Sequence, residues 1–289
     1  MSVTLAPIVA GPGERARPLS RALARPAARL GLGIVLLFFF LCAFAPLIAP
    51  DDPYAQDLMS ALARPSLAHL LGTDQYGRDV ASRVLYGARY ALLAIVVGDG
   101  LALGLGTTMG LAAGYLGGAV DAVLMRIVDV LLAFPYLLLA LIIVAALGPS
   151  LLHSMIAIGI VYTPQYARLV RGQVLSVRQM DFVRAARALG ASRARIILRH
   201  VAPNSLSPVI IMATLQAGSV VVETAGLSFL GLGAQPPSPD WGALLADGQN
   251  YFLTAWWIAT FPGLAIFLVV LGFNLLGDAL RREFDPRAR

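Results

Sequence analysis

The chain has 289 residues, of which 58% are hydrophobic and only 13% are charged. Soluble globular domains carry about 25% charged residues, so this composition excludes an ordinary water-soluble enzyme, a disordered chain and a coiled coil. The net charge is +6, and all 22 basic residues are arginines, because the sequence contains no lysine. The 28 glycines and 18 prolines follow no triplet period, which excludes a collagen-like repeat.

Six apolar runs are long enough, or nearly so, to cross a bilayer as helices, which takes about 20 residues. In chain order they are residues 30–49, 91–116, 130–148, 151–167, 205–233 and 251–277. The fourth run is short, whereas the second and the fifth each carry one acidic residue, Asp99 and Glu223. The sequence therefore predicts an all-α integral membrane protein with six transmembrane helices, the first followed by a five-helix core within residues 90–280.

Arginines are distributed unevenly between the segments that join these runs. If six helices cross the membrane, 18 of the 22 arginines fall on the side that holds both termini. Cytoplasmic loops accumulate arginine and lysine, so both termini are predicted to be cytoplasmic. This gives cytoplasmic tails at 1–29 and 281–289, an extracytoplasmic segment at 50–89 and a cytoplasmic loop at 168–204. The asymmetry also explains most of the basic charge, which argues against nucleic-acid binding.

The first run follows a basic start, as a signal peptide would. Its apolar stretch is too long for a signal peptide and five more runs follow, so a membrane helix is predicted instead. Cys42 lies within this run and is the only cysteine, so the chain cannot form an internal disulfide.

The cytoplasmic loop predicts two short helices separated by a glycine. Asp181 can cap the first helix, and Gly190 fits the left-handed position that ends it. The residues that share one face at helical spacing are Phe182, Ala185, Ala186 and Leu189. Ser192 can cap a second helix, which Pro203 is expected to end before the next membrane run. The small, apolar face suits a docking partner, or the chain's own membrane or helix bundle; the residues alone leave these alternatives open.

The same residues carry a resemblance to a known family. Arg184-Ala185-Ala186, then Gly190 and Pro203, resemble the EAA loop of binding-protein-dependent ABC importer permeases. Arg184 stands where that loop has glutamate, while the spacing of Ala-Ala, Gly and Pro matches. In the family this helix docks onto an ATPase subunit. The resemblance therefore implies that Phe182, Ala185, Ala186, Leu189 and Gly190 form the coupling contact, where a bulky residue at Ala186 or Gly190 would uncouple ATP hydrolysis from transport.

Two further stretches resemble the C-type permeases of dipeptide and oligopeptide importers. The external one contains Gly72-Thr73-Asp74 and then Gly77-Arg78-Asp79, and the other runs from Gly226 to Trp241. The likeness extends from about residue 30 to residue 285. It implies a bacterial inner-membrane subunit that forms half of a translocation pathway, with a homologous permease, two cytoplasmic ABC ATPases and an extracytoplasmic binding protein as partners. Related importers carry dipeptides, longer peptides, glutathione or nickel complexes.

The residues of the external stretch also have a structural interpretation. Asp74 and Asp79 could be cation ligands, but a turn at residues 72–74 that caps a helix beginning near Arg78 is simpler, because aspartate commonly caps helices. Cysteine and histidine do not cluster, so no metal site is predicted. A nucleophile elbow begins at Gly226 but has Leu230 in place of its last glycine, so no catalytic residue is predicted either.

The absence of lysine bears on the source of energy. A phosphate-binding loop for ATP requires a lysine, and this chain has none. The chain is therefore expected not to be an enzyme and to bind no cofactor, with ATP and magnesium held by separate ATPase subunits.

An ion-coupled secondary transporter is the alternative from another class. A charged side chain at the bilayer centre costs about 2.5–3.5 kcal/mol even on lenient scales, so Asp99 and Glu223 are candidate functional groups. No arginine lies in either run, and two isolated carboxylates support ion coupling only weakly.

Glycines recur every four residues in the second run, at Gly106, Gly110 and Gly114. This spacing predicts close helix packing, either within the subunit or against a second permease. Prolines in three of the later runs, Pro135, Pro164 and Pro262, can kink their helices.

Overall fold

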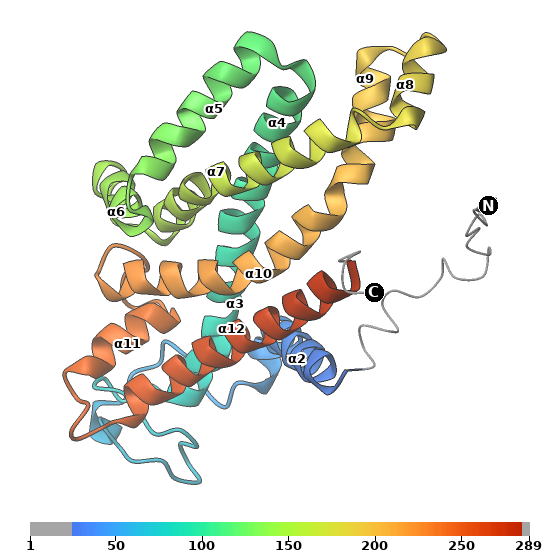
Figure 1. Cartoon of the computed structure of the whole chain (residues 1–289). Helices are drawn as coiled ribbons and strands as arrows, with labels where there is room; N and C mark the ends of the chain where they lie inside the picture. The colour runs from blue at the N-terminus through green and yellow to red at the C-terminus, as the bar shows by residue number, and fades with distance from the viewer. Residues whose placement is uncertain (1–24, 285–289) are drawn as a thin grey trace, which may run out of the picture.

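The structure, a computed structural model, describes residues 25–284, which form helices joined by loops (Figure 1). The helices are α2 (Pro26–Ile48), α3 (Val80–Ala94), α4 (Gly100–Leu116), α5 (Gly118–Ala133), α6 (Tyr136–Leu147), α7 (Leu151–Val177), α8 (Asp181–Ala188), α9 (Arg193–Ile196), α10 (Ala202–Phe229), α11 (Trp241–Gln249) and α12 (Trp257–Phe284). A short 3₁₀ helix, η1 (Leu58–Ser60), lies between α2 and α3, in the segment predicted to be external, which we call the external segment. Two π-helical turns, η2 (Ile95–Asp99) and η3 (Ile197–Val201), join neighbouring α-helices. Most of the predicted N-terminal tail, residues 1–24, and the last five residues lie outside the described residues.

Four helices within residues 25–284 are long and apolar enough to cross a membrane, or five if the bent pair α5 and α6 is one span. The four are Pro26–Ile48, Val80–Leu116, Arg193–Phe229 and Trp257–Glu283. The second begins at Val80 rather than at residue 91. It starts there because Asp79 caps it, its carboxylate accepting a hydrogen bond from the backbone N–H of Ser82. All-helical membrane architecture is therefore confirmed.

The run predicted at residues 130–148 is bent at Pro135, one of the three prolines expected to kink their helices. Helices α5 and α6 meet at an angle of 96°. Proline lacks a backbone N–H and disfavours helical geometry in the residue before it, and Phe134, which precedes Pro135, is extended at φ −89° and ψ 141°. In contrast, Pro164 and Pro262 lie inside continuous helices.

Helix α7 spans 27 residues but lacks the hydropathy of the other candidates. Its polar side chains are satisfied inside the bundle: the Thr163 hydroxyl donates to the Gly159 carbonyl at 2.8 Å, and the buried Ser154 hydroxyl donates to the Leu232 carbonyl at 3.1 Å. A helix covered by other helices does not need an apolar surface on every side. A test based on mean hydropathy therefore misses a helix such as α7, even where its length is sufficient to cross a membrane.

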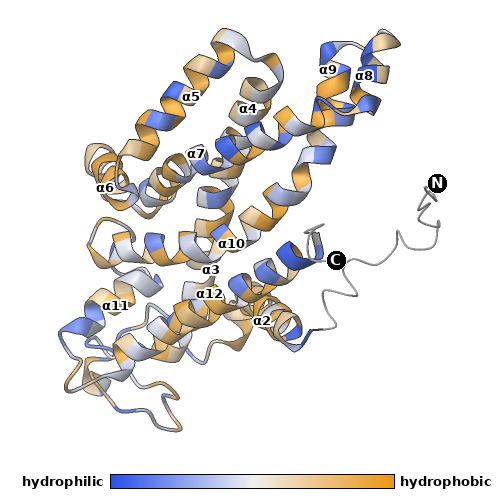
Figure 2. Cartoon of the chain, in the orientation of Figure 1, coloured by the Kyte–Doolittle hydropathy of each residue, from blue (hydrophilic) through white to orange (hydrophobic). Residues whose placement is uncertain are grey.

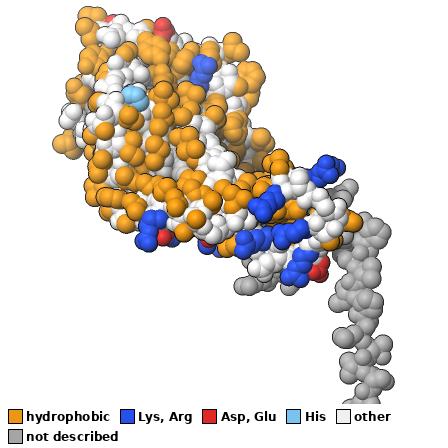
Figure 3. All heavy atoms as spheres, turned by 90° about the horizontal axis from the view of Figure 1, so that it is seen from above, with side chains coloured by type: hydrophobic (Ala, Val, Ile, Leu, Met, Phe, Trp, Pro, Cys, Tyr) orange, Lys and Arg blue, Asp and Glu red, His pale blue; other side chains and the backbone are white. Residues whose placement is uncertain are grey.

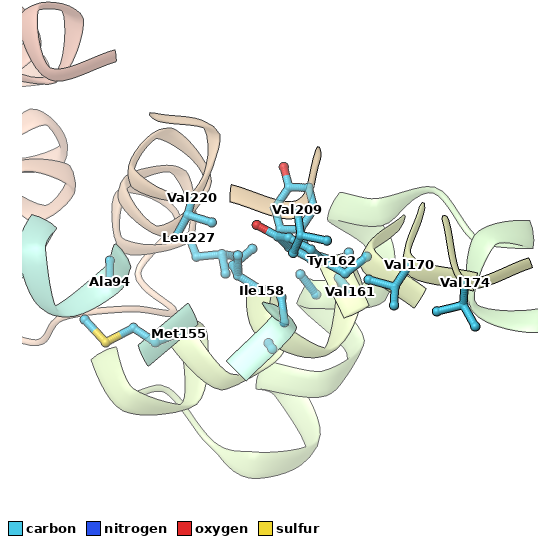
Figure 4. Packing of buried hydrophobic residues seen from close by; sticks show 14 of the residues in the cluster. Ala94, Met155, Ile158, Val161, Tyr162, Val170, Val174, Val209, Val220 and Leu227 are labelled. Atoms are coloured by element: carbon cyan, nitrogen blue, oxygen red, sulfur yellow. The ribbon is translucent and has the colours of Figure 1, made fainter. Parts of the chain in front are cut away.

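The glycines of α4 let it lie directly against α7. A Cβ added at Gly110 would lie 2.6 Å from the Val170 Cβ, and one at Gly106 would lie 2.3 Å from the Tyr166 Cβ. Contacts shorter than 3 Å are not tolerated, so only glycine permits this approach. The predicted packing within the subunit is confirmed for these glycines. The same core extends to α10, where Val220 and Leu227 lie beside Ile158 of α7 (Figure 4).

A second core holds the first helix in place. Phe38 of α2 is buried, and its ring lies 6.2 Å from the Phe273 ring of α12 and 6.5 Å from the Trp241 ring of α11. The backbones approach closely at Gly31, where an added Cβ would lie 2.7 Å from the Leu275 Cβ. Helix α2 therefore packs along α12, as Figure 1 shows.

Polar and apolar regions separate along the molecule. Hydrophobic residues cover the long helices, whereas polar residues gather on α8, α9 and the C-terminal end of α12 (Figure 2). The space-filling view shows a mostly hydrophobic face with arginines concentrated at one end (Figure 3). The external segment that includes η1 lies at the opposite end of the long helices from α8 and α9 (Figure 1). This arrangement fits a protein whose middle is covered by lipid.

Candidate coupling surface and intramembrane polar groups

The predicted coupling helix projects from the bundle as α8 (Figure 1). Its first residue is Asp181, so the prediction that Asp181 is the N-cap is wrong: Met180 occupies that position and provides no side-chain cap. Val183 anchors the helix, because it is fully buried in the same core cluster as Ile196 of α9. The apolar side of α8 that is exposed is therefore separate from the side that holds it to the bundle.

Because Val183 faces the bundle, most of the residues predicted to contact the ATPase are left exposed. Phe182 and Leu189 have exposed fractions of 41% and 88%, and Ala185 is exposed as well. Ala186 is half-buried and packs against the core cluster. Four of the five residues, Phe182, Ala185, Leu189 and Gly190, thus lie on the accessible surface of α8 and the turn that follows it. Ala186 instead packs α8 against the bundle.

Gly190 ends α8 as predicted. Its φ is +81°, a left-handed conformation that favours glycine, and its N–H donates to the Arg187 carbonyl at 3.0 Å. The N–H of Ala191 donates to the Ala186 carbonyl at 3.1 Å. The predicted cap of the next helix is present too, since the Ser192 hydroxyl accepts from the Arg195 N–H at 3.4 Å. The two short helices therefore have a defined angle between them.

Pro203 does not end a helix, which corrects the prediction. The π-helical turn η3 runs directly into α10, and Pro203 lies in the first turn of α10. Proline has no N–H to donate to the preceding turn, and the i→i+5 π turn η3 lies directly before it, where the regular α-helical hydrogen-bond pattern is interrupted. Helix α9 is therefore joined to α10 by continuous helix, whereas α8 is joined to α9 by the turn at Gly190.

The external motif folds into a buried ion-pair cluster. The Arg78 Nε donates to the Asp74 Oδ2 at 2.6 Å, and the Arg83 Nε lies 3.6 Å from the same oxygen. Asp74, Arg78 and Arg83 are each at most 2% exposed. Asp74 therefore pairs with two arginines, and Asp247, 3.6 Å from the Arg78 Nη2, supplies a second negative charge. The helix cap expected of the turn at residues 72–74 is supplied by Asp79.

The remaining motif residues hold the external segment against α12. The Trp257 indole N–H donates to the Thr73 carbonyl at 3.0 Å, and a Cβ added at Gly72 would lie 2.6 Å from that indole nitrogen. Gly77, at φ +72°, passes close to the backbone of Asp57. The six motif residues are therefore brought together, and their contacts are structural.

One group near this motif has the composition of a metal site. Asp51, His69 and Asp79 place three possible ligand atoms within 4.8 Å of one another. The His69 Nδ1 lies 3.2 Å from the Asp79 Oδ1, and the Asp79 Oδ2 accepts from the Ser82 N–H at 2.7 Å. Asp79 is thus already engaged as a helix cap.

The two intramembrane carboxylates are each paired with a tyrosine of α7. The Tyr166 hydroxyl donates to the Asp99 Oδ1 at 2.6 Å, and the Tyr162 hydroxyl donates to the Glu223 Oε1. Sequence reasoning missed these tyrosines, although their spacing of four residues places them on one face of a helix. Both carboxylates therefore have a hydroxyl donor in place of a basic partner.

Asp99 and Glu223 have different surroundings. Asp99 is 5% exposed and ends the π turn η2, at the edge of a groove of about 550 Å³ between α4, α10 and α12. Glu223 is half-buried on α10, near the point where the Gln216 amide donates to the Gln165 Oε1 of α7 at 3.4 Å. Asp99 is thus enclosed, whereas Glu223 belongs to a more accessible polar surface.

Comparison with known proteins agrees with this architecture. Residues 106–289 match the family described as binding-protein-dependent transport system inner membrane component, and residues 19–65 match the N-terminal TM domain of oligopeptide transport permease C. The probable D,D-dipeptide transport system permease protein DdpC of Escherichia coli (strain K12) is 48% identical over 255 residues, which cover 88% of this chain and 86% of DdpC. The dipeptide transport system permease protein DppC of Alkalihalophilus pseudofirmus is 47% identical over 260 residues, covering 90% and 86%.

Two further comparisons add a relative and a fold. The glutathione transport system permease protein GsiD of Pectobacterium atrosepticum is 45% identical over 225 residues, covering 78% of this chain and 75% of GsiD. The solved MetNI methionine ABC transporter, in inward-facing conformations, matches with a TM-score of 0.56 and 18% identity, covering 70% of this chain and 97% of the matched chain. The chain belongs to the family of binding-protein-dependent transport system inner membrane components, and it has the fold of an ABC importer permease.

Proposed function

We propose that this family member forms half of the translocation pathway of an ATP-driven importer for dipeptides or oligopeptides in the bacterial inner membrane. The observation that carries the proposal is the identity of nearly half of the aligned residues with DdpC and DppC, both named as dipeptide permeases. The likeness to GsiD supports glutathione, itself a small peptide, as the alternative substrate.

Six transmembrane helices with both termini in the cytoplasm are part of the proposal. The four apolar helices and the bent α5–α6 pair account for five spans, and α7 is the sixth. Its length of 27 residues is sufficient to cross a bilayer. Six spans place α8, α9 and the end of α12, which together carry six arginines, on one side, in agreement with the positive-inside rule.

Energy is proposed to come from partner subunits. The chain has no lysine and therefore no phosphate-binding loop, so two ATPase subunits would hold ATP and magnesium, and this chain would bind no cofactor. A homologous permease would complete the pathway, and an extracytoplasmic binding protein would deliver substrate. The exposed apolar side chains of Phe182 and Leu189 at the end of α8 are suited to insertion into a cleft on an ATPase.

Movement of the ATPases would reach the membrane helices through this contact. Val183 of α8 and Ile196 of α9 are buried in one core cluster, which holds the two helices together, and η3 connects α9 to α10 without a break. A displacement of α8 would therefore tilt α10, the helix that carries Glu223. This continuity supports α8 as the coupling element.

Reconstitution tests the proposal. The chain is co-expressed with the neighbouring permease and ATPase genes, purified through a tag, and placed in liposomes with the binding protein and labelled dipeptide outside and ATP inside. Co-purification of an ATPase and uptake that requires both ATP and binding protein are expected. Peptide accumulation by this chain alone, driven by a proton gradient without ATP, would instead establish the ion-coupled alternative.

A further inference from the structure

Polar side chains form a stripe along the seam between α7 and α10 at membrane depth. On α10, Gln216, Ser219 and Glu223 recur at intervals of three and four residues, which places them on one helical face. On α7, Tyr162 contacts Glu223, and Gln165 accepts a hydrogen bond from Gln216. We call these five residues the polar seam.

The polar seam is accessible in the isolated subunit. Gln165 is exposed, and Gln216, Ser219 and Glu223 are half-buried. Polar groups directed at lipid lose hydrogen bonds to water without replacement, so they are found facing a watery cavity or another protein. The seam therefore belongs to a surface that lipid does not cover.

Glu223 is the charged centre of this seam. Its Oε1 accepts from the Tyr162 hydroxyl, while its Oε2 is buried and has no hydrogen-bond partner among the described residues. No basic group of the described chain forms an ion pair with Glu223. Oε2 therefore has an unused acceptor position, and a cationic donor reaches it when the Glu223 side chain turns toward the accessible part of the seam.

Asp99 provides a contrast within the same subunit. It is also paired with a tyrosine, but it is only 5% exposed, and its neighbours at the groove are mostly apolar. The groove beside Asp99 carries threonine hydroxyls but no side-chain amide, whereas two glutamines belong to the seam around Glu223. The combination of access, an unpartnered oxygen and neighbouring amides occurs at Glu223 rather than at Asp99.

On this basis we infer that the polar seam lines the translocation pathway and that Glu223 binds the terminal ammonium group of a peptide in transit. The inference rests on the proposed function and specifies its substrate contact. An ammonium presents three donors, of which one can reach Oε2, while the amides of Gln165 and Gln216 match the peptide backbone. Tyr162 is a positioning residue, because its hydroxyl holds the carboxylate through Oε1.

A cysteine-labelling experiment tests the seam without depending on the binding protein. Cys42 is the only cysteine, so Cys42→Ala supplies a background for two reporters, Ser219→Cys in the seam and Ile210→Cys, which is 57% exposed and, nine residues away, lies on the opposite face of α10. The assembled complex in liposomes is labelled with a hydrophilic maleimide, with or without millimolar alanylalanine or its N-acetylated form.

The expected results concern both access and charge. Ser219→Cys should react at least tenfold faster than Ile210→Cys, and alanylalanine should slow the labelling of Ser219→Cys at least threefold. N-acetylalanylalanine, which lacks the ammonium, should not protect, and Glu223→Gln should abolish protection while leaving the labelling rate without peptide unchanged. Tyr162→Phe should weaken protection, and a higher peptide concentration should restore part of it.

Other outcomes overturn the inference. Equal labelling at both reporters would mean that the seam is not in water, and equal protection by the acetylated peptide, or in Glu223→Gln, would mean that the carboxylate does not bind the ammonium. Co-purified ATPase activity shows that each variant is assembled. If ATP-driven peptide uptake persists while protection fails, only the subsite is wrong; if no ATPase assembles, the proposed function fails.

Discussion

Arg78 and Asp74 form an ion pair that is almost completely removed from solvent: the guanidinium Nε lies 2.6 Å from the carboxylate Oδ2, and the two side chains are 2% and 1% exposed. Arg83 approaches the same carboxylate oxygen and reaches the carbonyls of Pro53 and Ser238, each at 3.4 Å. A single aspartate thus connects the external segment, the start of α3 and the loop after α10.

Removing the Asp74 carboxylate should strongly destabilise the folded protein. Asp74→Ala leaves the buried Arg83 without its ion-pair partner and Arg78 with only Asp247, at 3.6 Å, and breaking a buried pair in this way typically costs about 3–5 kcal/mol. We expect a large fall in the melting temperature of the purified protein in detergent. The matched control is Asp129→Ala, whose exposed pair with Arg168 has side-chain exposures of 54% and 56% and should contribute at most about 1 kcal/mol. Equal effects of the two substitutions would contradict this account.

The glycine stripe gives a second stability prediction. Gly110→Ala would place a Cβ 2.6 Å from the Val170 Cβ, forcing α4 away from α7, whereas Gly104→Ala on the same helix meets no atom within 4 Å. Overpacking typically costs about 1–3 kcal/mol, so Gly110→Ala should lower the melting temperature and Gly104→Ala should leave it unchanged or raise it. A stable Gly110→Ala protein that fails only to bind the second permease would instead place this stripe at the subunit interface.

The coupling surface predicts a loss of transport without a loss of stability. Leu189 is 88% exposed, so Leu189→Asp should not unfold the subunit, but it should prevent apolar contact with the ATPase. We expect peptide uptake to fall at least tenfold and ATPase co-purification to weaken, with the melting temperature of the isolated subunit unchanged. Leu67→Asp, at a 99% exposed position in the external segment, serves as the control and should transport normally.

Substitution at the end of α8 separates two effects. Gly190→Val should strain the backbone, because its φ of +81° is unfavourable for a β-branched residue, although open space surrounds its Cβ position. The α8–α9 angle should change, and ATP hydrolysis should become independent of binding protein and peptide. Gly190→Asn tolerates this conformation better and should retain coupling; uncoupling in both variants would point to a direct steric contact with the ATPase instead.

Asp240 predicts a dependence of stability on pH. Its carboxylate caps α11 by accepting from the N–H groups of Gly242 and Ala243 at 3.0 and 3.1 Å, and burial raises its pKa above the usual range. A raised folded-state pKa means that the folded protein holds this proton more tightly, so the contribution of the group to stability is full below about pH 4 and is lost as the pH rises through the folded value.

Two substitutions at this position check the sign. Asn caps about as well as Asp and carries no charge, so Asp240→Asn should gain melting temperature relative to the original protein at pH 7 and lose that gain near pH 4. Asp240→Ala loses the cap and should cost about 1 kcal/mol. A relative gain for Asp240→Asn that is the same at both pH values would show that the buried charge is not responsible.

Much of this protein is determined by its sequence. Apolar runs of bilayer length and the positions of 22 arginines predict helices and orientation because lipid excludes unpaired backbone polar groups and basic loops remain in the cytoplasm. The end of α8 at Gly190 and the cap at Ser192 also follow from local backbone chemistry. These features depend on neighbouring residues, or on the membrane, and not on distant contacts.

Tertiary structure determines the rest. It bends α5 against α6 at Pro135 while leaving Pro164 inside a continuous helix, assigns the cap of α3 to Asp79 and the buried ion pair to Asp74, and continues the helix through Pro203. It also brings Tyr162 to Glu223, 61 residues apart in the chain. Local sequence cannot specify these outcomes, because each depends on which side chain or carbonyl another helix places within hydrogen-bonding or packing distance.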